Sequence, residues 1–233
     1  MQSGQAVGTP FNDQYFSRLV STTRPILGES IVRNLLGLLS KFFPIKEGRG
    51  KLSLDVGCGV GHVLKVLTEF GYDTYGTDIS NYAVETARLI ARDPNNVKVA
   101  DATRLIPFNQ RFDLITCFEV IEHVPAPPLL LFNCYSKLRA GGLLILSTPN
   151  ALSPLTFLRG DPTHVNVHNL GYWKRLIRVL PNAKPRFFAV QYVPFLWKIE
   201  GKFRHFECPI LGATLLLAIR DGNGNPHIRC RKP

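Results

Sequence analysis

Alternating strand-like and helix-like segments between residues 51 and 150 constrain the fold of this chain more than any other feature. Short apolar runs of strand length alternate with segments of helical periodicity, and glycines or an Asp-Pro pair end the helical segments. Parallel strands need long crossover connections, usually helical, so this order predicts a largely parallel α/β sheet with helices on both faces. The expected strands of this part cover residues 52–56, 74–77, 97–100, 112–117 and 143–147.

Composition and periodicity divide the chain into four parts. The first has apolar residues at helical spacing and predicts an N-terminal helical extension or lid. The second is the alternating core, and the third adds an irregular loop, a helix and the last strands of the same domain. The fourth is a basic tail. The parts cover residues 1–50, 51–150, 151–220 and 221–233.

Positive charge is concentrated in the C-terminal third of the chain. Residues 151–233 hold 13 Lys and Arg against 4 Asp and Glu, a net charge of +9 out of +11 for the whole chain. Such a surface favours an anionic partner, which could be RNA, a phosphorylated small molecule or an acidic membrane surface. The alternative is that the charge confers only solubility.

The sequence also bears on location. No apolar run of about 18 residues is present, so no transmembrane segment is predicted. Residues 1–10 lack the pattern of a secretory signal, and the five cysteines contain no C-x-x-C pair. We therefore expect free thiols and a cytoplasmic location.

A glycine-rich loop directly follows the first expected strand and opens a helix. Gly57, Cys58, Gly59 and Gly61 allow a tight turn and close backbone approach to a ligand, and the helix start adds unpaired N–H groups. Asp55 precedes this loop and can accept a hydrogen bond from a cationic amino group, whereas it would repel a pyrophosphate. The loop therefore favours a cationic ligand over the nicotinamide dinucleotide of a dehydrogenase.

Two further acidic residues follow the next two strands. Asp78 ends the second strand and can accept both hydroxyls of a ribose, with Ile79 packing on an adenine ring. The alternative for Asp78 is a helix-start residue before Ser80. Asp101 follows the third strand and could accept from the adenine amino group, with the N–H of Ala102 facing the ring. The alternative for Asp101 is a turn aspartate.

Six motifs in this order resemble the class I S-adenosylmethionine-dependent methyltransferases of the ubiquinone-biosynthesis type and the related type 11 methyltransferases. The resemblance implies a Rossmann-like sheet of seven strands, mostly parallel, whose antiparallel last strand covers residues 213–220. It also implies S-adenosylmethionine as cofactor, with Phe118 lining the donor site beside the loop glycines, Asp78 and Asp101. The motifs are Leu54–Gly61, Thr77–Ser80, Val99–Ala102, Phe112–Ile115, Glu119–Val124 and Leu138–Gly142.

The segment after the fourth strand carries the acceptor chemistry. Glu119, Glu122 and His123 supply two carboxylates and an imidazole, which could hold a divalent metal together with His164 from a later loop. This pattern resembles the small-RNA 3′-end 2′-O-methyltransferases, in which such residues hold a metal that binds ribose hydroxyls. It also resembles the ubiquinone O-methyltransferases. Without a metal, His123 or His164 would act as a general base beside Glu119, or would only line the pocket.

The predicted function is methyl transfer from S-adenosylmethionine to an oxygen of a small-molecule acceptor that could be anionic. One alternative is an RNA methyltransferase, and a second is a non-catalytic partner subunit that keeps the fold. The aromatic and basic segment at residues 187–206 could stack on nucleic acid. It could equally cap the substrate, contact lipid-like acceptors, or simply pack as strands.

Overall fold

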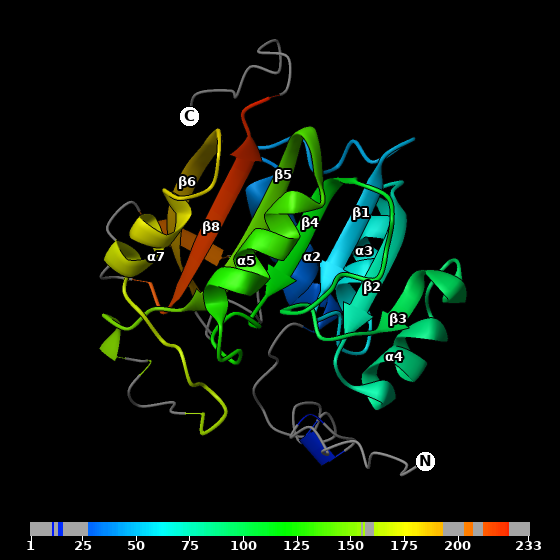
Figure 1. The fold of residues 1–233 in the computed structure, drawn as a ribbon, viewed down its shortest axis with the longest axis horizontal. Helices are drawn as coiled ribbons and strands as arrows, with labels where there is room; N and C mark the ends of the chain where they lie inside the picture. The colour runs from blue at the N-terminus through cyan, green and yellow to red at the C-terminus, as the bar shows by residue number, and fades with distance from the viewer. Residues whose placement is uncertain are drawn as a thin grey trace.

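A single sheet with helices on both faces forms the described part of the chain (Figure 1). The computed structural model describes residues 11, 14, 15, 28–154, 156, 161–192, 203–206 and 212–223. The strands are β1 (Leu52–Val56), β2 (Asp73–Asp78), β3 (Val97–Val99), β4 (Phe112–Phe118), β5 (Leu138–Pro149), β6 (Ala183–Tyr192), β7 (Phe203–Phe206) and β8 (Thr214–Asp221). The helices are α2 (Glu29–Leu39), α3 (His62–Glu69), α4 (Asn81–Arg88), α5 (Pro127–Ser136) and α7 (Leu170–Ile177), with a short 3₁₀ helix, η1 (Pro94–Asn96).

The order of the eight strands is β3-β2-β1-β4-β5-β8-β6-β7. Strands β1 to β5 pair in parallel, whereas β8 runs antiparallel to its neighbours β5 and β6. The predicted α/β fold class is confirmed, and the expected antiparallel last strand is β8. The strands expected at residues 52–56, 74–77, 97–100, 112–117, 143–147 and 213–220 are present. Strand β6 overlaps the aromatic and basic segment at residues 187–206 and β7 lies within it, in agreement with the alternative that this segment packs as strands.

The two faces of the sheet bury separate apolar clusters. Leu114 of β4 packs with α2 and α3, whereas the next residue, Ile115, packs with α5 and α7. Leu216 and Leu217 of β8 divide between the same two clusters. Successive residues of a strand point to opposite faces, so a strand covered by helices on both sides must be apolar throughout.

Side-chain caps begin two of the helices, and the sequence predicted the first of them, at Ser80. The Ser80 hydroxyl accepts a hydrogen bond from the Ala83 N–H at the start of α4 (3.3 Å). The Asn169 side chain accepts from the Tyr172 N–H at the start of α7 (3.1 Å). These bonds satisfy N–H groups that the first turn of a helix leaves unpaired.

The strand order reverses between β1 and β4, which lie side by side in the middle of the sheet. In open α/β sheets, ligands bind outside the carboxyl ends of the strands at such a reversal. The glycine-rich loop follows β1, Asp78 ends β2, and Glu119 follows β4. The fold therefore brings the predicted donor and acceptor residues to one edge of the sheet.

The basic C-terminal third is only partly described. Residues 193–202 and 224–233, which include much of the aromatic and basic segment and most of the predicted tail, lie outside the described residues. Within the described part, the Arg186 guanidinium lies over the rings of Phe42 and Phe188, at 5.2 and 5.3 Å from their centroids. Lys174 lies over Phe187 at 5.4 Å. These cations thus contribute to packing.

No helix among the described residues is long and apolar enough to span a membrane.

Candidate active site

The glycine-rich loop after β1 has the backbone that only glycines adopt easily. Gly57, Gly59 and Gly61 have φ values of 73°, 50° and 91°, in the left-handed region. A Cβ atom on Gly57 would also overlap the Cγ2 atom of Val120, which lies in the loop after β4. The loop therefore packs closely against the segment that carries the acceptor residues, and a side chain at Gly57 would push the two apart.

Hydrogen bonds join this loop to the end of β2. The Cys58 N–H donates to the Thr77 carbonyl (3.0 Å), and the Gly59 N–H donates to the Asp78 Oδ2 atom (2.9 Å). The other carboxyl oxygen of Asp78 accepts from the Ser80 N–H (2.9 Å). Burial raises the pKa of Asp78, and these backbone bonds oppose the rise. Each carboxyl oxygen retains a lone pair, so Asp78 could still accept ribose hydroxyls.

Of the residues predicted to surround adenine, Ile79 has an exposed side chain, whereas Asp101 and Ala102 already take part in hydrogen bonds within the structure. Ile79 is 42% exposed beside Asp78, so its side chain is free to cover a flat ring. The Oδ1 atom of Asp101 accepts from the N–H and hydroxyl of Thr103 (2.9 and 2.6 Å), as in a turn aspartate. The Ala102 carbonyl accepts from the Asn133 side chain (2.8 Å). These bonds hold the loop after β3 in place.

Two of the predicted donor residues lie in the interior. Asp55 is only 2% exposed, and its Oδ1 atom accepts a hydrogen bond from the Thr116 hydroxyl (2.7 Å). Burial raises the pKa of Asp55 to about 7, although the bond from Thr116 opposes this. Phe118 is buried in the cluster beneath α2 and α3. Neither side chain is exposed at the surface where a ligand would bind.

Glu119 begins the acceptor segment in an unusual conformation. Its φ is 52°, and its N–H donates to the Ser147 hydroxyl oxygen (3.0 Å). The Ser147 hydroxyl donates in turn to the Glu119 Oε1 atom (2.7 Å). Burial raises the pKa of Glu119, and the bond from Ser147 opposes the rise. Backbone strain of this kind persists only where surrounding contacts hold it, and it occurs often at functional sites.

Glu122 is a buried acid without hydrogen bonds of normal geometry to its carboxyl group. The residue is 0% exposed, and neither carboxyl oxygen makes a hydrogen bond of normal geometry among the described residues, although the Thr148 hydroxyl and the Glu119 carboxyl group are near enough to influence its pKa. Burial, followed by the charge of Glu119, raises its pKa well above the usual range. The backbone carbonyl of Glu122 accepts from the N–H groups of Val165 and Asn166 (2.9 Å each), which ties the histidine-bearing loop to this segment.

The surroundings of His123 determine its tautomer. The Asp161 carboxylate accepts from the Thr163 N–H (2.9 Å) and hydroxyl (2.6 Å), so the hydroxyl proton of Thr163 is already used. The His123 Nδ1 atom lies 3.1 Å from the Thr163 carbonyl and 3.0 Å from its hydroxyl oxygen, and both must then act as acceptors. Nδ1 therefore carries the proton, and Nε2 of the neutral ring has a free lone pair.

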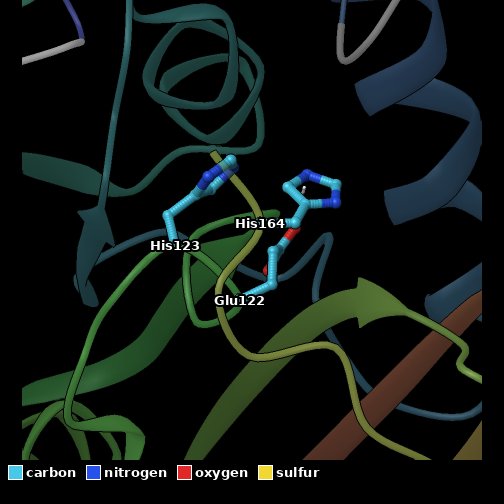
Figure 2. Close-up of side chains that lie close together, drawn as sticks. All are labelled: Glu122, His123 and His164. Carbon is cyan, nitrogen blue, oxygen red and sulfur yellow. Dashed lines mark ion pairs between the residues drawn. The ribbon is translucent and has the colours of Figure 1, made fainter. Parts of the chain in front are cut away.

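Three of the four predicted metal ligands converge (Figure 2). Ligand atoms of Glu122, His123 and His164 lie within 4.8 Å of one another, and the His164 Nε2 atom is 4.0 Å from the Glu122 Oε1 atom. Burial lowers the pKa of both histidines, which favours the neutral form that can bind a metal. Glu119 does not belong to this group. His168, from the same loop as His164, stacks on a tyrosine of α7, with ring centroids 3.7 Å apart.

The family model described as a methyltransferase domain matches residues 29–188 of this chain. The chain belongs to this methyltransferase family. The predicted class I, S-adenosylmethionine-dependent methyltransferase and its methyl donor are thereby confirmed at the level of the family.

Curated relatives of this methyltransferase domain include ubiquinone biosynthesis O-methyltransferases. One from Coxiella burnetii is 38% identical over 105 residues, which cover 44% of this chain and 45% of the relative. One from Psychrobacter arcticus is 35% identical over 118 residues, which cover 47% and 44%. The chain therefore spans a little under half the length of the curated relatives it matches.

Similar solved structures support the fold. A possible histamine N-methyltransferase from Thermotoga maritima superimposes with a TM-score of 0.67 and 16% identity, covering 90% of this chain and 95% of that one. The magnesium protoporphyrin IX methyltransferase of Synechocystis, with bound S-adenosylhomocysteine, gives 0.63 and 19% with the same coverage. At these identities the similarity concerns the fold alone.

Sequence reasoning missed several residues that shape the methyltransferase site. Thr163 orients His123, and Ser147 holds Glu119. Phe11, from the N-terminal segment, lies edge-on against the His123 ring with centroids 5.4 Å apart. Thr163 stands in a turn sequence, Asp161-Pro162-Thr163, that indicates a local hydrogen bond. Phe11 and Ser147 carry no comparable local signal.

Proposed function

We propose that this methyltransferase domain moves a methyl group from S-adenosylmethionine to an oxygen of a small-molecule acceptor, which a divalent cation helps to bind and activate. The cation would be held by Glu122, His123 and His164. The observation that carries this proposal is the Glu122 carboxyl group, which is completely buried, has no hydrogen bond of normal geometry among the described residues and lies beside two imidazoles whose pKa burial lowers. A buried, unsatisfied acid costs free energy that a bound cation would offset.

The residues at the donor side fit S-adenosylmethionine. The left-handed glycines leave the backbone open to a ligand, and Asp78 has acceptor capacity for ribose hydroxyls. The exposed side chain of Ile79 stands beside it for the adenine ring. The sulfonium of the donor is itself a good electrophile. The chain therefore needs mainly to position the two substrates and to exclude water.

The residues at the acceptor side fit a divalent cation with mixed nitrogen and oxygen ligands. A bound cation would lower the pKa of an acceptor hydroxyl and so favour the attacking alkoxide. The hydrogen bond from Nδ1 to Thr163 would fix the tautomer and the orientation of the His123 ring, so that the Nε2 lone pair is available to the cation. Many histidine ligands of metals are held by an outer partner in this way. Glu119, outside the group of three, would lie beside the bound acceptor.

A metal-free mechanism remains the alternative for the same residues. Burial keeps His123 and His164 neutral near pH 7, so either imidazole could take the acceptor proton as a general base. The printed name of the curated relatives, ubiquinone biosynthesis O-methyltransferase, supports an oxygen acceptor in both cases. The two mechanisms differ in whether the chain binds a cation.

Calorimetry with the full chain tests the proposal. The wild-type chain should bind S-adenosylhomocysteine and, separately, one Zn²⁺ or Mn²⁺ ion. Glu122→Gln should lose the cation and keep the nucleoside, whereas the control Glu85→Gln, at an exposed ion pair on α4, should keep both. A wild-type chain that binds no cation would contradict the metal mechanism. A chain that binds no S-adenosylhomocysteine would favour the non-catalytic partner subunit.

RNA as the acceptor is distinguished by its salt dependence. Affinity that falls steeply between about 50 and 200 mM salt would favour an RNA acceptor, because phosphate contacts release counterions. Absence of RNA binding at low salt would leave the small-molecule acceptor.

A further inference from the structure

The loops that carry His123 and His164 meet at the proposed cation site (Figure 2), and Asn166 joins them. The backbone N–H of Asn166 donates to the Glu122 carbonyl oxygen at 2.9 Å. Its side-chain Nδ2 atom donates to the Val124 carbonyl oxygen at 2.6 Å. Glu122 and Val124 are the two neighbours of His123 in the chain. One asparagine therefore holds the backbone on both sides of one proposed ligand, and it stands two residues after the other.

The partners of the Asn166 side chain fix the orientation of its amide group. A backbone carbonyl can only accept a hydrogen bond, so the NH₂ group of the amide must face Val124. The amide oxygen then faces His168, whose Nε2 atom lies 3.4 Å away and can donate to it. His168 is itself stacked on Tyr172 in the first turn of α7. The Asn166 side chain is therefore held between α7 and the loop after β4.

A second set of hydrogen bonds holds the other end of the same loop. The His164 N–H donates to the Asp161 carbonyl oxygen at 3.0 Å, and the Asp161 carboxylate accepts from the N–H and hydroxyl of Thr163. The Thr163 carbonyl accepts in turn from the His123 Nδ1 atom at 3.1 Å. Residues 161–166 are thus anchored on both sides of His164. None of these bonds uses the Nε2 atom of either proposed histidine ligand, so both atoms stay available to a cation.

We propose that Asn166 is a positioning residue for the cation site, because its two hydrogen bonds keep His123 and His164 close enough to bind one ion together. The inference rests on the proposed function, since it concerns the same ligands. Outer partners hold metal ligands in place before the metal binds, and their loss typically weakens metal affinity by about 10- to 100-fold. The hydrogen bonds of Asn166 within the described residues do not involve the glycine-rich loop. The affinity for the methyl donor should therefore not depend on them.

Calorimetry with the full chain and Zn²⁺ tests the role of Asn166. Asn166→Ala should weaken Zn²⁺ binding by about tenfold or more and should change the affinity for S-adenosylhomocysteine by less than about twofold. The matched control is Asn169→Ala, which removes a side-chain hydrogen bond of the same loop, to the Tyr172 N–H, and should leave both affinities within about twofold. A Zn²⁺ affinity that is unchanged in Asn166→Ala, or that falls equally in Asn169→Ala, would overturn the positioning role.

NMR spectra of the histidine side chains, recorded with a chelator present, test the same role without any metal. Asn166→Ala should shift the ring signals of His123 and His164, whereas Asn169→Ala should leave them unchanged. Asn166→Ser, whose hydroxyl ends one bond short of the amide nitrogen, should give similar shifts and replaces Asn166→Ala if that variant does not fold. Unchanged signals in the Asn166 variants would overturn the positioning role. If the wild-type chain bound no cation, the metal mechanism would fail, and these spectra would still decide whether Asn166 positions the two rings.

Discussion

Replacing Asp55 with asparagine should remove the contribution of this carboxyl group to the pH dependence of folding stability between about pH 4 and pH 7. Asp55 is buried, and the surrounding apolar environment raises its pKa to about 7. In the unfolded chain the same group titrates near 3.9. The folded state therefore holds a proton that the unfolded state has released, so the free energy of unfolding falls as the pH rises between these two values.

The size of this effect follows from the two pKa values. A difference of about three pH units corresponds to about 4 kcal/mol of stability lost between about pH 4 and pH 7. An asparagine cannot ionise, so this loss should disappear. Its carbonyl can still accept from Thr116, but its amide needs a new acceptor, which costs about 1–3 kcal/mol at every pH. The variant should be less stable than the wild type near pH 4.5 and comparable or more stable at pH 8.

Thermal unfolding at a series of pH values measures this prediction. Between low and high pH, the difference in free energy of unfolding between wild type and Asp55→Asn should change by about 4 kcal/mol. For a chain of this size, this corresponds to a change of roughly 8–16 °C in the difference between their Tm values. Thr116→Val is the matched control: it removes the hydrogen bond that lowers the Asp55 pKa, so that pKa should rise further and the pH dependence should persist and extend to higher pH. A stability difference between wild type and Asp55→Asn that stays constant from pH 4.5 to 8 would refute the reasoning.

Three further predictions concern the loop, the cation and the core. Gly57→Ala should lower the free energy of unfolding in urea by about 2–5 kcal/mol, because the new Cβ atom is strained in the left-handed conformation and overlaps the Val120 side chain. A loss below about 0.5 kcal/mol would be inconsistent with that geometry. A divalent cation at about 100 times its Kd should raise the free energy of unfolding by about 2.7 kcal/mol, reversibly with a chelator; an equal gain in Glu122→Gln would place the ion elsewhere. Trp173→Ala should lower the free energy of unfolding in denaturant by about 3–5 kcal/mol because the side chain is fully buried, whereas Leu129→Ala, at an exposed position, should change it by no more than about 0.5 kcal/mol. Equal losses in the two variants would argue against the packing of α7.

Much of the fold could be predicted because its signals are local. The glycines at 57, 59 and 61 follow an apolar strand and occupy the left-handed conformations that such a loop requires. Asp78 stands at the end of β2, and Ser80 caps the helix after it, both within a few residues of the pattern that indicated them. Each of these features depends on neighbours in the chain, so periodicity and turn chemistry are sufficient to find them.

The sequence by itself determined the alternating fold, the glycine-rich loop after β1 and the residue types of the segment after β4. Only the tertiary structure decided which of these side chains meet. It joined Glu122 and His123 to His164 from a distant loop, left Glu119 hydrogen-bonded to Ser147, and buried Asp55 beside Thr116 of β4. It also brought Phe11 of the N-terminal segment edge-on against the His123 ring. Contacts between segments far apart in the chain depend on packing and burial, which leave no periodic trace in the sequence.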